Sequence, residues 1–187
     1  MNTDPIIFGT KNDAISLAHK AHAGQMYGDY DYTRHLRDVA LTLGSFGFGG
    51  DEWQIAAWLH DTVEDTDVTI EDIEAQFGEE VARFVSAVTT PASIGNRHAR
   101  LDALIQQLQE CPETLPLKLA DRIANVQFCW FNQDTRLFMY YREYGWFREG
   151  LRPLHTMPKV MKMWDKLDAL LGWWEPPPPT EKKHVDP

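Results

Sequence analysis

The sequence is poor in cysteine and in basic residues, and it has no long apolar run. Its 187 residues include two cysteines, Cys111 and Cys129, which form neither a Cys-x-x-Cys motif nor a disulfide framework, so we expect a reducing, cytoplasmic environment. Lysine and arginine total 18 against 28 acidic residues, giving a formal net charge of −10, which argues against sequence-independent nucleic-acid binding. Since no run of about 18 apolar residues and no signal-peptide pattern occurs, we expect neither a membrane span nor secretion.

Alternation of apolar and polar residues, the pattern of a half-buried strand, is also missing. Apolar residues instead recur at helical spacing, for example over 14–21, 81–88 and 101–108. This spacing, with 43% apolar residues and a length typical of one domain, predicts an all-α, single-domain helical bundle. We place the domain at residues 1–174. The proline run in residues 175–187 predicts an extended or disordered tail.

Several residues mark the expected ends of helices. Asp51 follows two glycines and is a predicted N-cap, and Thr69 begins a capping box with aspartate in the third helical position. Gly78 is expected to end the short helix that follows Thr69. Residues 24–31 and 89–96 are expected to form loops, because glycine or proline interrupts the helical pattern there.

One acidic segment has the residues of a metal site. His60 and Asp61 can each offer a lone pair to one cation, and Glu64 and Asp65 follow each of them at i+4, on the same side of a helix. A solvated acidic helix end is the alternative interpretation, because a His-Asp pair alone is weak support. With Asp67 included, this segment has four acidic residues within seven positions, and the repulsion between their charges favours a bound cation.

Two other segments supply possible partners. Asp121 interrupts an apolar helix, where an unpaired carboxylate would be costly. A salt bridge to Lys118 or Arg122 would explain Asp121 as well as a ligand role does, and His35 alone is typical of a packed or surface histidine. Taken together with His60 and Asp61, these two residues, His35 and Asp121, predict a ligand set of nitrogen and oxygen atoms from three helices. Such a set suits manganese or iron, with zinc possible, and the lack of cysteine ligands argues against a structural zinc site. The predicted ligands are His35, His60, Asp61 and Asp121.

The order of these residues resembles that of the HD metal-dependent phosphohydrolases. A longer series of motifs is similar to the hydrolase domain of the RelA/SpoT family, and in length to its stand-alone small alarmone hydrolases, such as the metazoan SpoT homologue. The resemblance covers roughly residues 12–150 and is most specific over 59–66. The motifs are His22-Ala23-Gly24-Gln25, Tyr32-x-x-His35, Ala57 to Thr66, Phe77-Gly78, Val88-Thr89 and Lys118 to Asn125.

The resemblance implies a reaction and its residues. One manganese ion would be held by the four predicted ligands, Glu64 and Asp65 would be the catalytic carboxylates, and Lys118, Asn125 and Tyr144 would contact the substrate. The implied activity removes the 3′-pyrophosphate of a nucleotide alarmone, releasing pyrophosphate and a nucleoside 5′-di- or triphosphate. An HD-type nucleotide phosphatase and a non-catalytic nucleotide sensor are the alternatives.

The substrate's base and the surroundings of its phosphates are less defined. The loop after Gln25 has no lysine or arginine before Arg34, so both a guanine alarmone, (p)ppGpp, and an adenine alarmone, (p)ppApp, fit. Met26 and Tyr27 either pack on the base or the loop packs on itself. Arg97 and Arg100, one turn apart at a predicted helix start, are either phosphate ligands or surface charges. Dense aromatic residues between 128 and 147 predict helix packing and leave a homo-oligomer open.

Overall fold

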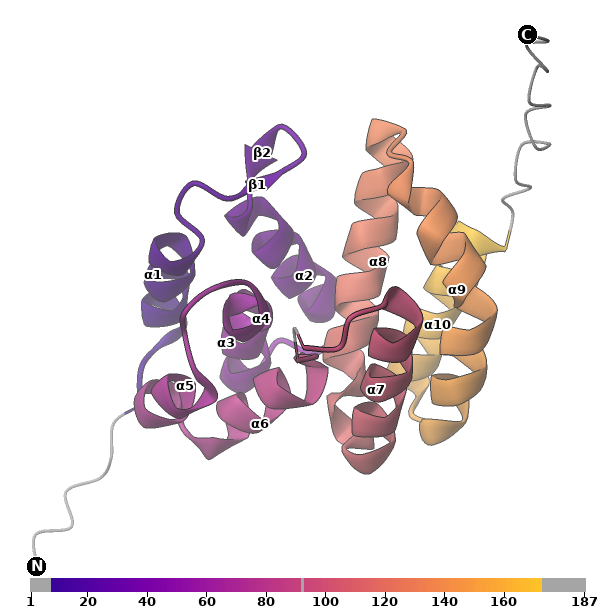
Figure 1. Ribbon diagram of the computed structural model, residues 1–187. Coiled ribbons are helices and arrows are strands. Elements are labelled where there is room, and N and C mark those ends of the chain that lie inside the picture. The colour runs from indigo at the N-terminus through magenta and orange to yellow at the C-terminus, as the bar shows by residue number, and fades with distance from the viewer. Residues whose placement is uncertain (1–7, 92, 173–187) are drawn as a thin grey trace, which may run out of the picture.

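Helices run along nearly the whole described chain, as the spacing of apolar residues predicts (Figure 1). The structure, a computed structural model, describes residues 8–91 and 93–172. The all-α fold class is confirmed. The predicted boundary at residue 174 and the tail 175–187 lie outside the described residues and stay predictions. The elements are α1 (Lys11–Ala21), β1 (Met26–Tyr27), β2 (Tyr30–Asp31), α2 (Thr33–Ser45), α3 (Asp51–Leu59), α4 (Thr62–Asp65), α5 (Ile70–Phe77), α6 (Glu79–Val88), α7 (Arg97–Glu110), η1 (Pro112–Thr114), α8 (Leu115–Asn132), α9 (Arg136–Leu151), η2 (Arg152–Leu154) and α10 (Pro158–Leu171).

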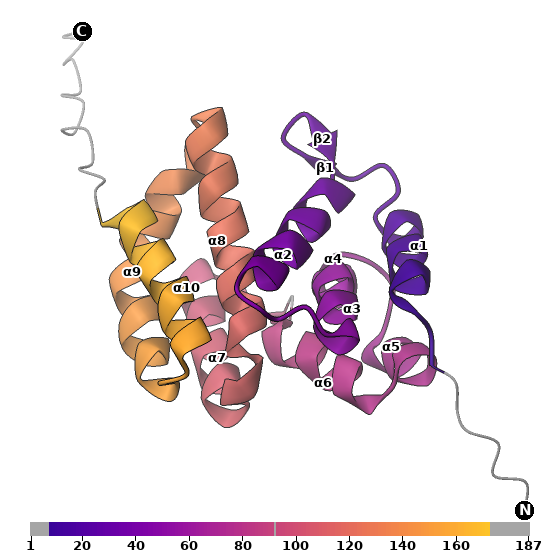
Figure 2. The same ribbon diagram turned by 180° about the vertical axis from the view of Figure 1, so that it is seen from behind.

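The helices form two groups that meet along α2 and α8. Helices α1 to α6 gather on one side and α7, α9 and α10 on the other, with α8 between them (Figures 1 and 2). Helix α2 contacts both α3 and α8, and α10 packs on α8. Leucines at the junction, including Leu36, Leu43 and Leu119, are fully buried. This packing brings the first turn of α2 and the middle of α8 close together, although they are far apart in the sequence.

The helix ends and loops agree with those predicted from the sequence, with two exceptions. The capping box at Thr69 and the helix end at Gly78 are as predicted. The N-cap of α3 is Gly50 rather than Asp51. Asp51 is the first helical residue, and its negative charge there interacts favourably with the positive end of the helix dipole. The second exception is a two-stranded antiparallel hairpin, β1 with β2, inside the predicted loop 24–31.

The helix that carries His60 is interrupted at that residue. Helix α3 ends at Leu59 and α4 begins at Thr62, so His60 and Asp61 lie at the junction rather than inside one continuous helix. The Asp65 N–H still donates to the Asp61 carbonyl at 3.0 Å, and the Thr62 hydroxyl donates to the Leu59 carbonyl at 2.7 Å. At this junction the side chains of His60 and Asp61 lie close to His35 in α2, and that of His60 also lies close to Asp121 in α8.

The hairpin turn depends on Gly28. This residue has φ +62°, and a Cβ built on it would lie 2.7 Å from Cζ of Phe128. We expect Gly28→Ala to lower the free energy of unfolding by about 1–2 kcal/mol for the left-handed backbone, plus the cost of displacing the Phe128 ring. Urea unfolding measures the loss. Gly24→Ala is the matched control, since Gly24 also has positive φ but has no atom within 4 Å of its Cβ position. An equal loss in both variants would contradict the predicted contact.

Candidate metal centre and active site

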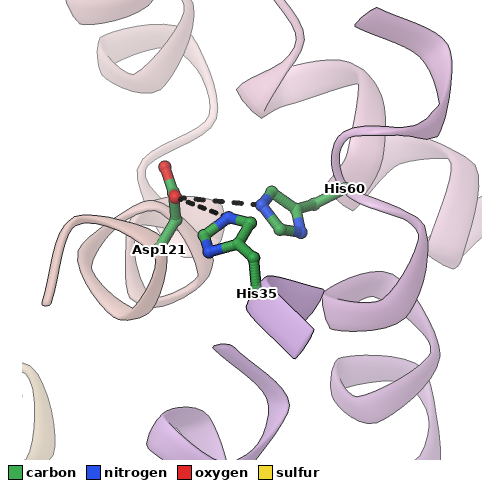
Figure 3. Close-up of side chains that lie close together, drawn as sticks. All are labelled: His35, His60 and Asp121. Atoms are coloured by element: carbon green, nitrogen blue, oxygen red, sulfur yellow. Dashed lines mark ion pairs between the residues drawn. The ribbon is translucent and has the colours of Figure 1, made fainter. Parts of the chain in front are cut away.

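Three segments distant in the sequence meet in one buried cluster. His35 comes from the first turn of α2, His60 follows α3, and Asp121 lies in the middle of α8 (Figure 3). Their exposed fractions are 2%, 1% and 6%. One ligand atom from each lies within 4.8 Å of the others. The structure therefore brings together three of the four residues predicted as metal ligands in a group tight enough to surround an ion.

The fourth predicted ligand lies beside this group. Oδ2 of Asp61 is 3.3 Å from Nε2 of His35 and 3.1 Å from Nε2 of His60. Oδ1 of Asp121 lies 3.3 Å and 3.8 Å from the same two nitrogens. Both imidazoles thus present Nε2 to two carboxylate oxygens, which gives a mixed set of nitrogen and oxygen donors.

The hydrogen bonding of His60 fits a metal ligand. Its Nδ1 lies 2.9 Å from the Ala57 carbonyl oxygen, so Nδ1 is the nitrogen that carries the proton in the neutral ring. Nε2 is buried and makes no hydrogen bond of good geometry among the described residues, although Oδ2 of Asp61 lies 3.1 Å away. A backbone carbonyl on the far nitrogen is the usual way in which a ligating histidine is oriented. The residues present therefore fit a divalent cation.

The charges in the cluster compensate one another. Burial disfavours the ionised Asp61, but the imidazoles of His60 and His35 outweigh it and hold the Asp61 pKa well below its usual range. Burial is likewise outweighed at Asp121, whose pKa is held low mainly by Lys118, with Nζ at 2.7 Å, and by the imidazoles. The same carboxylates raise the pKa of His60 to about 10, against the effect of burial. A cation would meet carboxylates that are already ionised.

Two further carboxylates stand next to the cluster, as predicted. Glu64 is held by an ion pair with Arg100 and by the N–H and hydroxyl of Thr90, at 3.2 and 3.3 Å. Asp65 accepts a hydrogen bond from the Tyr32 hydroxyl at 3.0 Å. Burial, with the nearby charge of Asp61, raises the pKa of Asp65. The two carboxylates therefore have different environments, one paired with a cation and the other not.

A cavity of about 250 Å³ joins the cluster to these carboxylates. Its wall carries four cationic side chains, which suits an anionic ligand. Arg97 is fixed by two hydrogen bonds to Glu143, at 2.6 and 3.0 Å, and the buried Arg122 shares that partner. The lining residues are Met26, Tyr27, Tyr32, His35, Asp61, Glu64, Asp65, Arg97, Lys118, Asp121, Arg122, Asn125, Arg136 and Tyr140.

Most of the predicted substrate residues line this cavity, and two lie elsewhere. Arg100 borders a neighbouring hollow of about 70 Å³ and is paired with Glu64. The Tyr144 hydroxyl bonds to Asp168 in α10, so Tyr144 faces the packing between α9 and α10. The residues that do line the cavity are Lys118, Asn125, Arg97, Tyr27 and Met26.

Other cavity residues were not predicted from the sequence. Tyr140 lies one helical turn before Tyr144, on the face of α9 that meets α8, and Arg136 occupies the start of that helix. Arg136 is fixed by Asp134, at 2.7 and 2.9 Å, and lies over the ring of Tyr27. The pair Asp134 and Arg136 was the available signal, since an acid two residues before an arginine can orient it. Tyr32 was noted only within the motif that ends at His35.

The described part of the chain contains no helix long and apolar enough to cross a bilayer.

Comparisons with known proteins agree with this geometry. A family model described as "HD domain" matches residues 14–137. A guanosine-3′,5′-bis(diphosphate) 3′-pyrophosphohydrolase of Aquifex aeolicus is 41% identical over 109 residues, covering 56% of this chain and 16% of that protein. The guanosine-3′,5′-bis(diphosphate) 3′-pyrophosphohydrolase MESH1 of Danio rerio is 35% identical over 123 residues, covering 62% of this chain and 66% of that protein. The chain thus spans less than two thirds of the length of these curated relatives.

Solved structures show the same similarity. The structure of a metazoan SpoT orthologue matches with a TM-score of 0.74 and 25% identity, covering 89% of this chain and 96% of that one. A protein of Listeria monocytogenes matches with a TM-score of 0.59 and 26% identity, and the match covers 74% of this chain and 94% of that one. The family model includes His35, His60, Asp61 and Asp121, the residues around which the site is built. This chain belongs to the HD-domain family.

Proposed function

We propose that this protein is a metal-dependent pyrophosphohydrolase that removes the 3′-pyrophosphate from a nucleotide alarmone of the (p)ppGpp or (p)ppApp type. The products would be pyrophosphate and a nucleoside 5′-di- or triphosphate. The observation that carries the proposal is a cavity lined by three of the four predicted metal ligands, two further carboxylates and four cationic side chains, with the fourth ligand, His60, directly behind His35 and Asp61. The names of the Aquifex and Danio relatives, and the report that the metazoan SpoT orthologue hydrolyses ppGpp, support the same reaction.

The cationic wall accounts for the binding of a phosphate-rich ligand. Guanidinium groups bind phosphate oxygens through paired N–H donors, and Arg97 and Arg122 are already oriented by Glu143. The chain as a whole carries a formal charge of −10, so this positive patch is local and would concentrate an anion at the cavity rather than elsewhere on the surface.

We assign the metal to His35, His60, Asp61 and Asp121. Imidazole and carboxylate donors suit manganese or iron, and we propose manganese because the resemblance to the RelA/SpoT hydrolases implies that ion. A bound divalent ion would supply Lewis acidity toward the phosphate group and toward water.

The carboxylates of this chain would handle the protons. In the proposed step, a water oxygen attacks phosphorus, the bond between phosphorus and the 3′-oxygen breaks, and the 3′-oxygen ends as a hydroxyl. We assign the proton of the attacking water to Glu64, whose position is fixed by Arg100 and Thr90, and the carboxylate is regenerated when that proton passes, directly or through solvent, to the departing 3′-oxygen. Asp65, on the same cavity wall, would orient that water. General acid–base groups of this kind contribute about 10²–10⁴-fold to the rate.

A product-resolved assay tests the proposal. The purified protein is incubated with Mn²⁺ and with guanosine or adenosine 3′,5′-bis(diphosphate), and products are separated by ion exchange. We expect one pyrophosphate and one nucleoside 5′-diphosphate per substrate, with turnover abolished by a chelator. Release of orthophosphate would instead indicate a nucleotide phosphatase. Binding without turnover would indicate a sensor and would contradict the proposal. The two bases, tested side by side, decide between (p)ppGpp and (p)ppApp.

Two further expectations from the sequence stay predictions, a cytoplasmic location and no binding to nucleic acid, and the sequence leaves self-association open.

A further inference from the structure

Tyr32 connects the metal-ligand cluster to the catalytic carboxylates. It is the residue immediately before α2, three positions from His35. Its hydroxyl lies 2.8 Å from Oδ2 of Asp61 and 3.0 Å from Oδ2 of Asp65. One side chain therefore contacts both a predicted metal ligand and a predicted catalytic acid, which come from opposite ends of the short α4 segment.

The ring of Tyr32 is held in place from more than one side. His22 stacks on it with a centroid distance of 4.6 Å and an interplanar angle of 16°, and Tyr27 meets it edge-on at 6.1 Å. The buried His22 is itself fixed, since its Nδ1 lies 2.7 Å from Oε1 of Gln25. The Gln25 amide then donates to the Asp65 carbonyl at 2.9 Å. The stack that orients Tyr32 is thus tied to the backbone of Asp65 as well.

We infer that Tyr32 is a positioning residue, which fixes Asp61 for the metal ion and Asp65 for the reacting water at the same time. A ligating carboxylate keeps its orientation when it accepts a hydrogen bond from a residue outside the ligand set. The Tyr32 hydroxyl provides such a bond to the oxygen of Asp61 that also faces both imidazoles. Because a hydroxyl has one proton to donate, Asp61 and Asp65 share this donor, and the position of each carboxylate is tied to the same tyrosine oxygen.

The first half of this inference concerns metal affinity and does not depend on the substrate. The second half, the effect on Asp65, rests on the proposed function. The two halves are measured separately, so a failure of one is distinguishable from a failure of the other.

Tyr32→Phe tests the first half, because it keeps the ring and its stack on His22 and removes only the hydroxyl. Mn²⁺ is titrated calorimetrically into the metal-free protein without nucleotide. We expect affinity about 10–100-fold weaker than that of the unmodified protein, the usual cost of losing such a partner. Tyr30→Phe is the matched control, since Tyr30 lies two residues before Tyr32, in β2, and is exposed, and the Mn²⁺ affinity of this variant should be unchanged. Unchanged affinity in Tyr32→Phe would overturn the inference.

A double-mutant cycle with Asp65→Asn tests the second half. With Mn²⁺ saturating, Tyr32→Phe should lower kcat about tenfold while KM for the nucleotide holds. In the Asp65→Asn background the same change should lower kcat no further, whereas its effect on Mn²⁺ affinity should persist, because that effect passes through Asp61. Independent, multiplicative losses in kcat would overturn the coupling to Asp65. A loss of Mn²⁺ affinity in a protein that turns over none of the tested nucleotides would support the metal half and contradict the proposed function. Thermal melting of each metal-free variant checks that the fold is retained.

Discussion

Asp61→Ala is expected to abolish metal binding and, with it, turnover. Oδ2 of Asp61 faces both imidazole nitrogens, at 3.3 and 3.1 Å, so its removal takes away a donor atom and a negative charge that lies close to both histidines. The loss of affinity should exceed the roughly 10–100-fold that follows from removing a mere hydrogen-bond partner of a ligand. Elemental analysis of protein dialysed after loading with Mn²⁺ measures the retained ion.

Asp67→Ala is the control for this experiment. It removes the same charge from the same acidic segment, but Asp67 is exposed and lies outside the cavity that holds the cluster. Asp67→Ala should keep its metal and its activity. A full complement of tightly held Mn²⁺ in Asp61→Ala would contradict the assignment of Asp61 as a ligand.

Glu64→Gln is expected to separate metal binding from catalysis. The contacts of Glu64 are with Arg100 and Thr90 rather than with the histidines, so metal content should match that of the unmodified protein. Turnover should fall by about 10²–10⁴-fold, because the amide cannot accept the proton of the attacking water. Pyrophosphate release and metal content are measured on the same preparation.

An exposed glutamate provides the comparison. Glu113 pairs with Arg83 on the surface as Glu64 pairs with Arg100, and Glu113→Gln should leave both metal content and turnover unchanged. A Glu64→Gln protein with full activity would remove Glu64 from the proposed mechanism.

The sequence predicts the helical fold and the metal cluster because both depend on patterns that short segments carry. Apolar spacing defines each helix, and a histidine followed by an aspartate, with two more acids one turn on, is visible within six residues. That His35 and Asp121 lie beside this segment is harder to predict, because they are far from it in the sequence. It was predicted from the order of motifs, and the packing of α2 against α8 is what places them together.

The remaining cavity residues depend on how helices pack, which local patterns do not specify. The predicted Tyr144 and the observed Tyr140 lie one turn apart on α9, and only the contact of that helix with α8 decides which of them reaches the cavity. Arg100 has the charge expected for phosphate binding, but the folded chain brings Glu64 within reach of its guanidinium. The N-cap is Gly50 rather than Asp51, because Gly50 has the extended backbone of a cap residue and Asp51 is already helical.

The ligands of the cluster come from the group of helices α1 to α6 and from α8, which lies between the two groups in Figure 1. An ion held there would act as a cross-link between that group and α8. A ligand that binds only the folded state adds about 2.7 kcal/mol of stability at a hundred times its dissociation constant. In cells starved of the ion a larger fraction of the chain would be unfolded and open to proteases, so the amount of this protein, and not only its activity, would follow the supply of the metal.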